Sequence, residues 1–409
     1  MAGLRAHGDA SALLSVTGDG PTQLLSYRQL AARALGVADA LDAAGLVAGE
    51  RVALLSHRRG ANEAVGLCGI LAAGGVVVPL DAGAPKLRLQ RQFNDSGCRG
   101  WVHDDSANEV VTAIAGASLR IELDTEGLVL ASVGDPVSGA AADTQLACVL
   151  HTSGSSGRPK AVPMSWQGID AFLQWMTTLL TLSPSDRVLR VAELVFDLAW
   201  FDHLATFRAG ATLCALSRRQ LAAGRSLAAA IDALAPSIIY GVPSMFIKLT
   251  AASDAPLSSS LRAICFAGEV FPRRQLATFA ERVPHAALYN LYGPTETNVC
   301  CYHALTAADR SGNSEIPIGV ACPYAQCRIV TKDGRTIRGQ GLGELVVSGP
   351  TAFNGEVSTG DRIQRAANGL FYFRGRLDRM VKLRGYRVDP CEVETTLATH
   401  PAVQRAAVT

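Results

Sequence analysis

Short apolar runs and helix-like stretches alternate along much of this chain, and this alternation constrains the fold more than any other feature. The apolar run at 51–56 is followed by a helix-like stretch at 62–73 and by the β-branched run "GGVVVPL". The same rhythm returns downstream with the strand-like segments "RVLRVAEL", "ATLCAL", "SIIYGV", "LRAICFAG" and "AALYNLYG". Repeated strand–helix–strand units predict an α/β fold in which helices cover parallel sheets.

Local signals mark where elements begin and end. Ser26 and Gln29 have the spacing of a capping box, and Gly45 is a plausible stop for the Ala- and Leu-rich helix that follows. After about residue 310 the sequence changes to short strand-like runs with the hairpin signal Asp333-Gly334. A chain of 409 residues exceeds one simple core. We therefore expect α/β subdomains at 1–145 and 146–310 and a small β-rich, barrel-like subdomain at 311–377.

Composition excludes several classes of protein. Charged residues make up 18% of the chain and the net charge is +2, so bulk charge does not predict a nucleic-acid or membrane surface. The ten cysteines include no CxxC pair, and no Cys/His cluster has zinc spacing, which favours reduced thiols. The N-terminus lacks the apolar core of a signal peptide, and the longest apolar run, 69–80, is too short to span a bilayer. We expect a soluble cytoplasmic protein.

The segment "LHTSGSSGRPKAVPMSW" follows an apolar strand-like run and is rich in Gly, Ser and Thr. Glycines allow close backbone approach, and successive N–H groups with hydroxyls can enclose a phosphate. Lys160 adds a positive charge, but Ala161 follows it, so the segment does not fit the nucleotide-binding P-loop pattern. The pattern predicts phosphate binding, with a flexible surface loop as the alternative.

Three further segments carry candidate chemistry. In "NLYGPTETNVC", Glu296 follows a Gly-Pro turn and can hold a hard cation beside phosphates; the alternative is an ordinary turn on which Tyr292 packs. In "STGDRI", Asp361 at a predicted strand end can accept hydrogen bonds from a ribose diol. The stretch "GRLDRMVKLRGYRVDPCEVE" mixes five basic residues and Asp378 with two glycines, and its alternative interpretation is a solvated basic face.

These four segments, in this order, resemble the adenylate-forming superfamily, which includes acyl-CoA synthetases and the amino-acid-activating adenylation domains of nonribosomal peptide synthesis. The segments "LSYRQL", "LAAGGVVVPLDAGAP", "FDLAWFD", "FAGE" and "GELVVSGP" match in order as well, so the resemblance covers nearly the whole chain. Each match alone is weak, whereas the ordered set is specific. Members convert a carboxylate and MgATP to an acyl-adenylate and pyrophosphate, and most then transfer the acyl group to a thiol.

The resemblance assigns roles residue by residue. It implies that the β- and γ-phosphates are bound by Thr152, Ser153, Gly154, Ser155, Ser156, Gly157 and Lys160. It places Thr295 at the α-phosphate and Glu296 at Mg²⁺, so that Thr152, Lys160, Thr295 and Glu296 form the catalytic set. It places Tyr292, Gly268 and Glu269 around adenine, and Asp361 with Arg376 at the ribose. Asp378 falls at the family's hinge, so 378–409 is expected to be the hinge and the truncated start of a C-terminal subdomain.

Two departures from the family pattern stand out. The segment "TAFNGEVS" is shorter than usual, which predicts a trimmed peripheral loop. The family's C-terminal subdomain continues for roughly another hundred residues and ends near a lysine that contacts the carboxylate and the α-phosphate, whereas this sequence stops at Thr409. Loss of one preorganised charge typically costs on the order of 10²–10³ in rate. The expectation is a chain that binds its ligands and adenylates poorly.

The substrate follows from Asp197, which matches the family position that pairs with an amino-acid ammonium. A carboxylate in an apolar pocket is costly unless a cation joins it; the alternative is a helix-capping Asp. The other aligned pocket positions are apolar or weakly polar: Leu198, Phe201, Tyr240, Cys265, Ala267, Leu291, Val299 and Cys300. The set resembles that of stand-alone proline-activating enzymes and predicts L-proline, with alanine or another small amino acid as the alternative.

The acceptor and the competing functions are also constrained. The sequence contains no carrier-protein segment with a Ser-bearing GGxS pattern, which predicts a separate carrier protein with a phosphopantetheine thiol; coenzyme A is the alternative acceptor. An acyl- or aryl-CoA ligase is a second function, against which Asp197 argues. A ligand-binding or scaffolding protein that has lost catalysis is a third, and the retention of Lys160, Glu296 and Asp361 argues against it.

Overall fold

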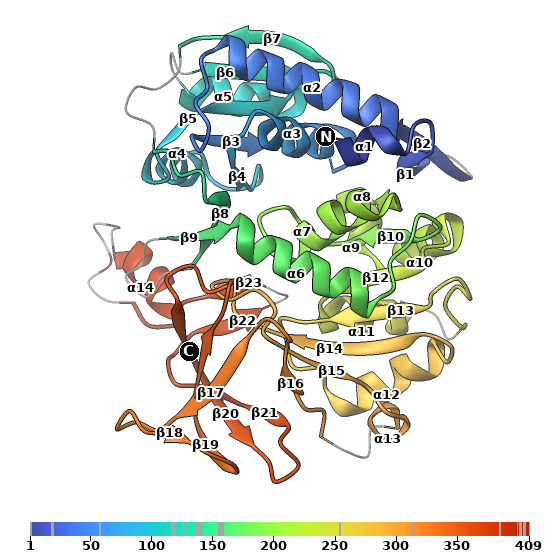
Figure 1. Ribbon diagram of the computed structural model, residues 1–409, viewed down its shortest axis with the longest axis vertical. Coiled ribbons are helices and arrows are strands. Elements are labelled where there is room, and N and C mark those ends of the chain that lie inside the picture. Colours follow the sequence, from blue (N-terminus) through green and yellow to red (C-terminus); the bar gives the residue numbers. More distant parts are fainter. Residues whose placement is uncertain are drawn as a thin grey trace. The chain divides into compact units, whose positions relative to one another are not determined.

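The computed structural model describes residues 2–17, 20–56, 59–115, 119–125, 127–135, 141–153, 159–252, 255–311, 315–383, 386–398, 400, 403 and 406–408 (Figure 1). The chain divides into two compact units. The first comprises 1–150 and 163–239, and the second comprises 151–162 and 240–409. The subdomain boundaries expected at residues 145, 310 and 377 stay predictions.

One sheet has strands in the order β7-β6-β5-β3-β4-β8-β9 and belongs to the first unit, except for residues 151–152 of β8 and 160–162 of β9, which belong to the second. Strands β3 to β6 pair in parallel, whereas β7 runs antiparallel to β6. All residues of β4 are buried, which explains why its sequence is apolar throughout rather than alternating. The strands are β3 Arg51–Leu55, β4 Val76–Leu80, β5 Cys98–Asp104, β6 Leu119–Leu123, β7 Val129–Val133, β8 Leu146–Thr152 and β9 Lys160–Ser165.

Helices cover this sheet, and α2 packs along α3 (Figure 1). The predicted capping box at the start of α2 is confirmed, because Ser26 accepts from the Gln29 N–H and the Gln29 side chain accepts from the Ser26 N–H. Gly45 follows the helix with φ +73°, a left-handed conformation that suits glycine. The helices are α1 Ala2–Ala6, α2 Tyr27–Ala43, α3 Ala61–Ala72, α4 Lys86–Asp95, a 3₁₀ turn Asp105–Ala107 and α5 Asn108–Ala115.

A second group of strands has the order β12-β10-β11-β1-β2 and belongs to the first unit, except for residues 240–241 of β12, which belong to the second. Strand β10 pairs in parallel with β11 and β12, and only β2 at the end is antiparallel. The helix expected after β10 is interrupted by a π-helical turn, Phe201–Ala205. The elements are β1 Ser11–Thr17, β2 Gly20–Ser26, β10 Arg187–Arg190, β11 Thr212–Ala215, β12 Ile238–Gly241, α6 Trp166–Leu179, α7 Leu198–Trp200, α8 Thr206–Ala209, α9 Arg218–Ala222 and α10 Gly224–Leu234.

The second unit contains a mixed group of strands, β13-β14-β15-β16. Strand β13 is parallel to β14, while β15 and β16 continue the group in antiparallel order. The rings of Phe246, Phe271 and Phe279 pack on one another, and Phe271 contacts Phe266 of β13 edge to face. The elements are β13 Ala263–Phe266, β14 Ala287–Tyr292, β15 Cys301–Ala304, β16 Val320–Ala321, α11 Pro243–Ala252, α12 Arg273–Arg282 and α13 Ala307–Arg310.

The rest of the second unit is rich in strands. An antiparallel sheet has the order β18-β17-β19-β20-β21, and the Asp333-Gly334 turn joins β17 to β18 with Gly334 at φ +82°. The hairpin β22-β23 and α14 follow. The elements are β17 Gln326–Val330, β18 Thr336–Ile337, β19 Gly341–Ser348, β20 Glu356–Arg365, β21 Phe371–Arg376, β22 Val381–Leu383, β23 Tyr386–Val388 and α14 Pro390–Ala398.

The predicted fold class is confirmed. Parallel strands covered by helices make up the α/β part of the chain, and the β-rich segment after residue 310 is the five-stranded antiparallel sheet. Among the helices of the described ranges, none combines the length and the apolar character that crossing a bilayer requires.

Candidate functional site

The second unit contains a cavity of about 910 Å³. Its walls come from the end of β13 and the turn after it, from β14, from β20 and β21, and from the segment that follows β21. Six residues expected at a nucleotide, ribose or hinge position line it together: Gly268, Glu269, Tyr292, Asp361, Arg376 and Asp378. Residues separated by more than a hundred positions in the sequence thus surround one space that is large enough for a nucleotide-sized ligand.

A chain of polar contacts crosses the cavity wall from Tyr292 to Asp378. The Tyr292 hydroxyl donates to one oxygen of the buried Asp361 carboxylate over 2.5 Å, and the Arg376 guanidinium donates to the other over 2.6 Å. Arg376 also donates to both oxygens of Asp378, each over 2.6 Å. These bonds fix a carboxylate at the cavity surface, where it can accept further hydrogen bonds from a diol.

The electrostatics of this chain of contacts follow from burial and pairing. Burial, with the Asp361 charge next in importance, raises the pKa of Tyr292 well above its ordinary value. Hydrogen bonds to Asp378 and the charge of Asp361 raise the pKa of Arg376. Tyr292 is therefore a neutral donor and Arg376 a permanent cation at neutral pH. Asp361 lies within β20, opposite Arg376 of β21, and the prediction that it ends a strand is wrong.

Glu269 is oriented by a residue that sequence reasoning missed. The Ser244 N–H and hydroxyl donate to the two oxygens of the Glu269 carboxylate over 2.9 Å and 3.2 Å. Gly268, at φ +85°, provides the turn that carries Glu269 to the cavity. Asn290 and Phe373 also line the cavity without having been predicted, and the Phe373 ring centroid lies 6.4 Å from that of Tyr292. Asn290 begins the segment "NLYGPTETNVC" but was given no role there, and no local motif distinguished Ser244 or Phe373.

Lys160 and Glu296, both in the second unit, form an ion pair of 3.7 Å. The Lys160 side chain is 61% exposed and that of Glu296 only 13%, so the ammonium is free to exchange its partner for an anion. Gly293 makes the turn before Glu296 possible, because a Cβ at this position would lie 1.7 Å from the Asn298 carbonyl oxygen. Thr295 is half-buried in the same turn.

The glycine-rich segment is only partly described. Thr152 ends β8 and is buried, and its hydroxyl has no hydrogen-bond partner within the described residues. Ser153 follows it and makes its own polar contact. The predicted phosphate-binding residues Gly154, Ser155, Ser156 and Gly157 lie outside the described residues.

The residues predicted to hold the substrate side chain fall into both units. In the second unit they cluster near the carboxyl ends of β12, β13 and β14 and are all buried: Tyr240, Cys265, Ala267, Leu291, Val299 and Cys300. Carboxyl ends of parallel strands are where ligands bind in open α/β sheets. Leu291 also lines the cavity. The Sγ atom of Cys300, however, lies beside those of Cys301 and Cys327.

In the first unit, Asp197, Leu198 and Phe201 lie on the segment after β10. Asp197 occupies the N-cap position of α7, yet its side chain makes no capping hydrogen bond there, which disfavours the capping alternative. It is half-buried, and its charge adds to the burial that raises the pKa of Cys148. Phe201 is fully buried at the start of the π-helical turn, a local distortion that is frequent at functional sites.

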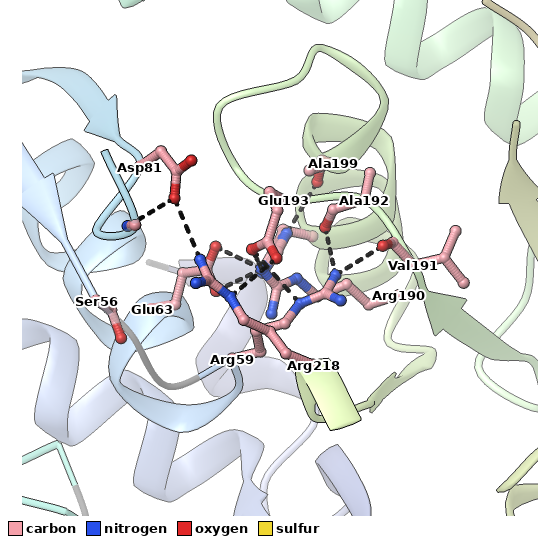
Figure 2. Close-up of polar contacts among 12 residues, drawn as sticks. Ser56, Arg59, Glu63, Asp81, Arg190, Val191, Ala192, Glu193, Ala199 and Arg218 are labelled. Carbon is pink, nitrogen blue, oxygen red and sulfur yellow. Dashed lines mark hydrogen bonds and ion pairs between the residues drawn. The ribbon is translucent and has the colours of Figure 1, made fainter. Parts of the chain in front are cut away.

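A network of charged side chains in the first unit supports this segment, as Figure 2 shows. Arg59 donates to the carbonyl oxygens of Val191 and Ala192 over 2.8 Å and 2.7 Å, immediately before the segment that carries Asp197. Both arginines at the centre, Arg59 and Arg190, have almost no exposed side-chain surface. The network is therefore a buried support for the chain between β10 and α7.

The remaining members of the network connect it to the α3 region and to α9. Arg190 pairs with Glu63 of α3 at 2.5 Å. Glu193 lies 3.6 Å from Arg59 and 3.4 Å from Arg218, and Arg218 lies 3.2 Å from Asp81. Burial raises the pKa of Glu63, and the neighbouring Arg190 and Arg59 oppose this shift. Sequence reasoning missed this network because its charges come from segments far apart in the chain.

Comparisons with known proteins agree with this geometry. The family described as "AMP-binding enzyme" matches residues 2–355. An L-proline–(L-prolyl-carrier protein) ligase of Streptomyces coelicolor is 33% identical over 422 residues, which cover 94% of this chain and 79% of the relative. A ligase of the same description from Pseudomonas fluorescens is 32% identical over 357 residues, covering 81% and 70%. The crystal structure of IdnL1 matches with a TM-score of 0.85 and 25% identity over 100% of this chain and 88% of that one.

Proposed function

This chain belongs to the family of AMP-binding enzymes and is an AMP-forming adenylating ligase, and we propose that it converts L-proline and ATP to prolyl-adenylate and pyrophosphate for loading of a carrier protein. The observation that supports this most is the cavity wall where Tyr292, Asp361 and Arg376 are bonded into one unit. The wall offers the same ligand an aromatic ring, on which a base can pack, and a fixed carboxylate, which can accept hydrogen bonds from ribose hydroxyls.

The nucleoside end of the ligand is assigned to this cavity. The Asp361 carboxylate accepts hydrogen bonds from the ribose hydroxyls, and Arg376 holds it in place. The Tyr292 ring packs on adenine, while Gly268 and the oriented Glu269 border the base. Each role needs a rigid group rather than a mobile one, and the contacts of Asp361 and Glu269 supply that rigidity.

The phosphate end is assigned to Thr152 through Gly157, Lys160, Thr295 and Glu296. Lys160 and Glu296 bring one positive and one negative group to the same place. A carboxylate oxygen is the hard donor that Mg²⁺ prefers, so Glu296 fits the ion. When bound, the ion neutralises phosphate charge. Lys160 then stabilises the negative charge of the phosphates, and the Thr152 and Thr295 hydroxyls donate to their oxygens.

Asp197 is assigned to the substrate amine. Asp197 is half-buried and does not cap its helix, and the secondary ammonium of proline offers two N–H donors to a carboxylate. The remaining predicted positions, mostly apolar, suit a compact ring. The relatives from Streptomyces coelicolor and Pseudomonas fluorescens are both described as ligases for L-proline and a prolyl-carrier protein, which supports proline here at 33% and 32% identity. The acceptor is the phosphopantetheine thiol of a carrier protein.

The test is calorimetric titration of the full chain with nonhydrolysable acyl-sulfamoyl-adenosine mimics of the adenylate. Binding of such a mimic uses the nucleoside and substrate sites without requiring turnover. We expect the prolyl mimic to bind at least about ten-fold more tightly than the alanyl, phenylalanyl and benzoyl mimics, a difference of about 1.4 kcal/mol. Preference for alanyl would redirect the substrate to another small amino acid, and preference for benzoyl would support an aryl-CoA ligase instead.

A further inference from the structure

Three cysteine side chains of the second unit converge on one point. Cys300 precedes β15, Cys301 is the first residue of β15, and Cys327 lies in β17. Their Sγ atoms all lie within 4.8 Å of one another, and those of Cys301 and Cys327 are 3.6 Å apart. Cys300 and Cys301 are fully buried and Cys327 is half-buried. Within the described ranges, no other group of three or more His, Cys, Asp and Glu side chains has this metal-binding spacing.

We propose that these three thiols, here called the thiol cluster, bind one thiophilic d¹⁰ metal ion, Zn²⁺ or Cu⁺, through the Sγ atoms of Cys300, Cys301 and Cys327. Thiolate sulfur is the ligand that selects these ions over hard cations. A metal–sulfur distance of about 2.3 Å places three ligand sulfurs roughly 3.8–4.0 Å from one another. The sulfurs observed here already approach this arrangement.

The chemistry of the cluster suits a cation. Metal binding requires thiolates, so each thiol that binds releases its proton. Hydrogen bonds from the thiols of Cys300 and Cys301 lower the pKa of Cys327, whereas burial raises the pKa of Cys300 and hydrogen bonds with the neighbouring thiols raise that of Cys301. The Cys327 thiol also donates to the Cys300 carbonyl oxygen over 3.6 Å. A disulfide is a different state, because its sulfurs would have to approach to about 2.05 Å.

The position of the cluster gives the ion a structural role next to the nucleotide cavity. Cys301 is the antiparallel partner of Tyr292, and the Cys300 N–H donates to the Tyr292 carbonyl over 2.8 Å. Cys327 belongs to the five-stranded sheet that also carries Asp361. A bound ion would therefore tie β15, beside the strand of Tyr292, to β17 and stabilise the second unit.

The test uses the full chain, reduced and treated with a chelator, then titrated anaerobically with Zn²⁺ against a chromophoric competitor and, in a second arm, with Cu⁺. We expect one equivalent of one of these ions to bind and to raise the thermal unfolding midpoint. The two arms identify which ion it is. Binding that saturates at no defined stoichiometry in both arms would overturn the proposal.

Cysteine variants locate the site. Cys327→Ser should weaken binding by about 100-fold or more because it removes one of three thiolates. Cys300→Ser is the second variant, in case the first is unstable. Cys214→Ser, at a buried thiol in β11 of the first unit, is the matched control and should bind as the parent does. Parent-like binding by both cluster variants, or a Cys301–Cys327 disulfide in the purified chain, would contradict the proposal. Metal binding is measured without ATP or amino acid, so its failure is distinguishable from a failure of the proposed adenylation.

Discussion

Asp361 is the residue on which the nucleoside end of the site depends. It accepts from Tyr292 and Arg376 within the cavity wall, so its carboxylate has a fixed position and a compensated charge. Sequence position alone suggested a carboxylate for a ribose, but the partners that orient it come from β14 and β21. The residue type was predictable from the motif, whereas its orientation was not.

Asp361→Asn should weaken binding of ATP and of the adenylate mimic by roughly 10- to 100-fold. An amide accepts more weakly than a carboxylate, and a hydrogen bond to a charged group contributes about 1.5–3 kcal/mol. Calorimetric titration measures the loss. Asp333→Asn, at an exposed turn of the same unit, is the control and should bind normally. Equal affinities for the Asp361 variant and the parent would exclude Asp361 from the nucleotide site.

Asp202 should make the stability of the chain depend on pH. Burial raises its pKa to about 8, although Arg190 and Arg59 favour its charged form. The folded chain thus retains a proton that the unfolded chain releases above about pH 4. The stabilisation from this proton is complete below about pH 4 and is lost as the pH rises through about 8, by at most about 1.4 kcal/mol per pH unit.

Urea unfolding of the parent and of Asp202→Asn between pH 5 and 8.5 checks this. The parent should lose stability relative to the variant as the pH rises. His203, whose pKa burial lowers to about 3, has the opposite slope below about pH 6.5, but it is present in both proteins and cancels in the difference. A free-energy difference that stays constant with pH would show that Asp202 is ionised throughout the range.

At the scale of elements, the segment between β10 and α7 is held by side chains rather than by sheet pairing. Arg59 binds two carbonyl oxygens at its start, and Arg190 is anchored by Glu63 of α3. Apolar runs predicted β3, β4 and β10 from the sequence because burial dictates residue type. The charges between them carried no local signal, since Arg59 and Arg190 meet only after folding brings their segments together.

Arg59→Ala should impair positioning of Asp197 more than binding of the nucleotide. The change leaves two carbonyl oxygens without their donor, and breaking a buried ion pair typically costs 3–5 kcal/mol. We expect affinity for the prolyl mimic to fall by about ten-fold or more, with ATP affinity within about two-fold of the parent. Arg218→Ala, at a side chain that is 44% exposed, is the control. A parallel loss of ATP affinity would indicate general destabilisation instead.

At the scale of the whole molecule, the fold class and the family were predictable, and the assembled sites were only partly so. Strand–helix alternation and ordered motifs depend on local sequence, which a single chain displays directly. The thiol cluster shows the limit of prediction from local sequence. Cys301 and Cys327 are 26 residues apart on strands of different sheets, so the spacing of the cysteines in the sequence did not reveal that their thiols converge. Long-range pairing creates such sites.

The central claim is that this adenylating enzyme recognises the amine of its substrate through Asp197. The most direct measurement compares two mimics, prolyl- and cyclopentanecarbonyl-sulfamoyl-adenosine, which differ in the ring nitrogen, on the parent and on Asp197→Asn. The parent should prefer the prolyl mimic by at least about ten-fold, and the variant should lose that preference while still binding the cyclopentane mimic. A variant that keeps the parent's preference would contradict amine recognition by Asp197, and a parent that shows no preference would contradict the assignment as an amino-acid-activating enzyme.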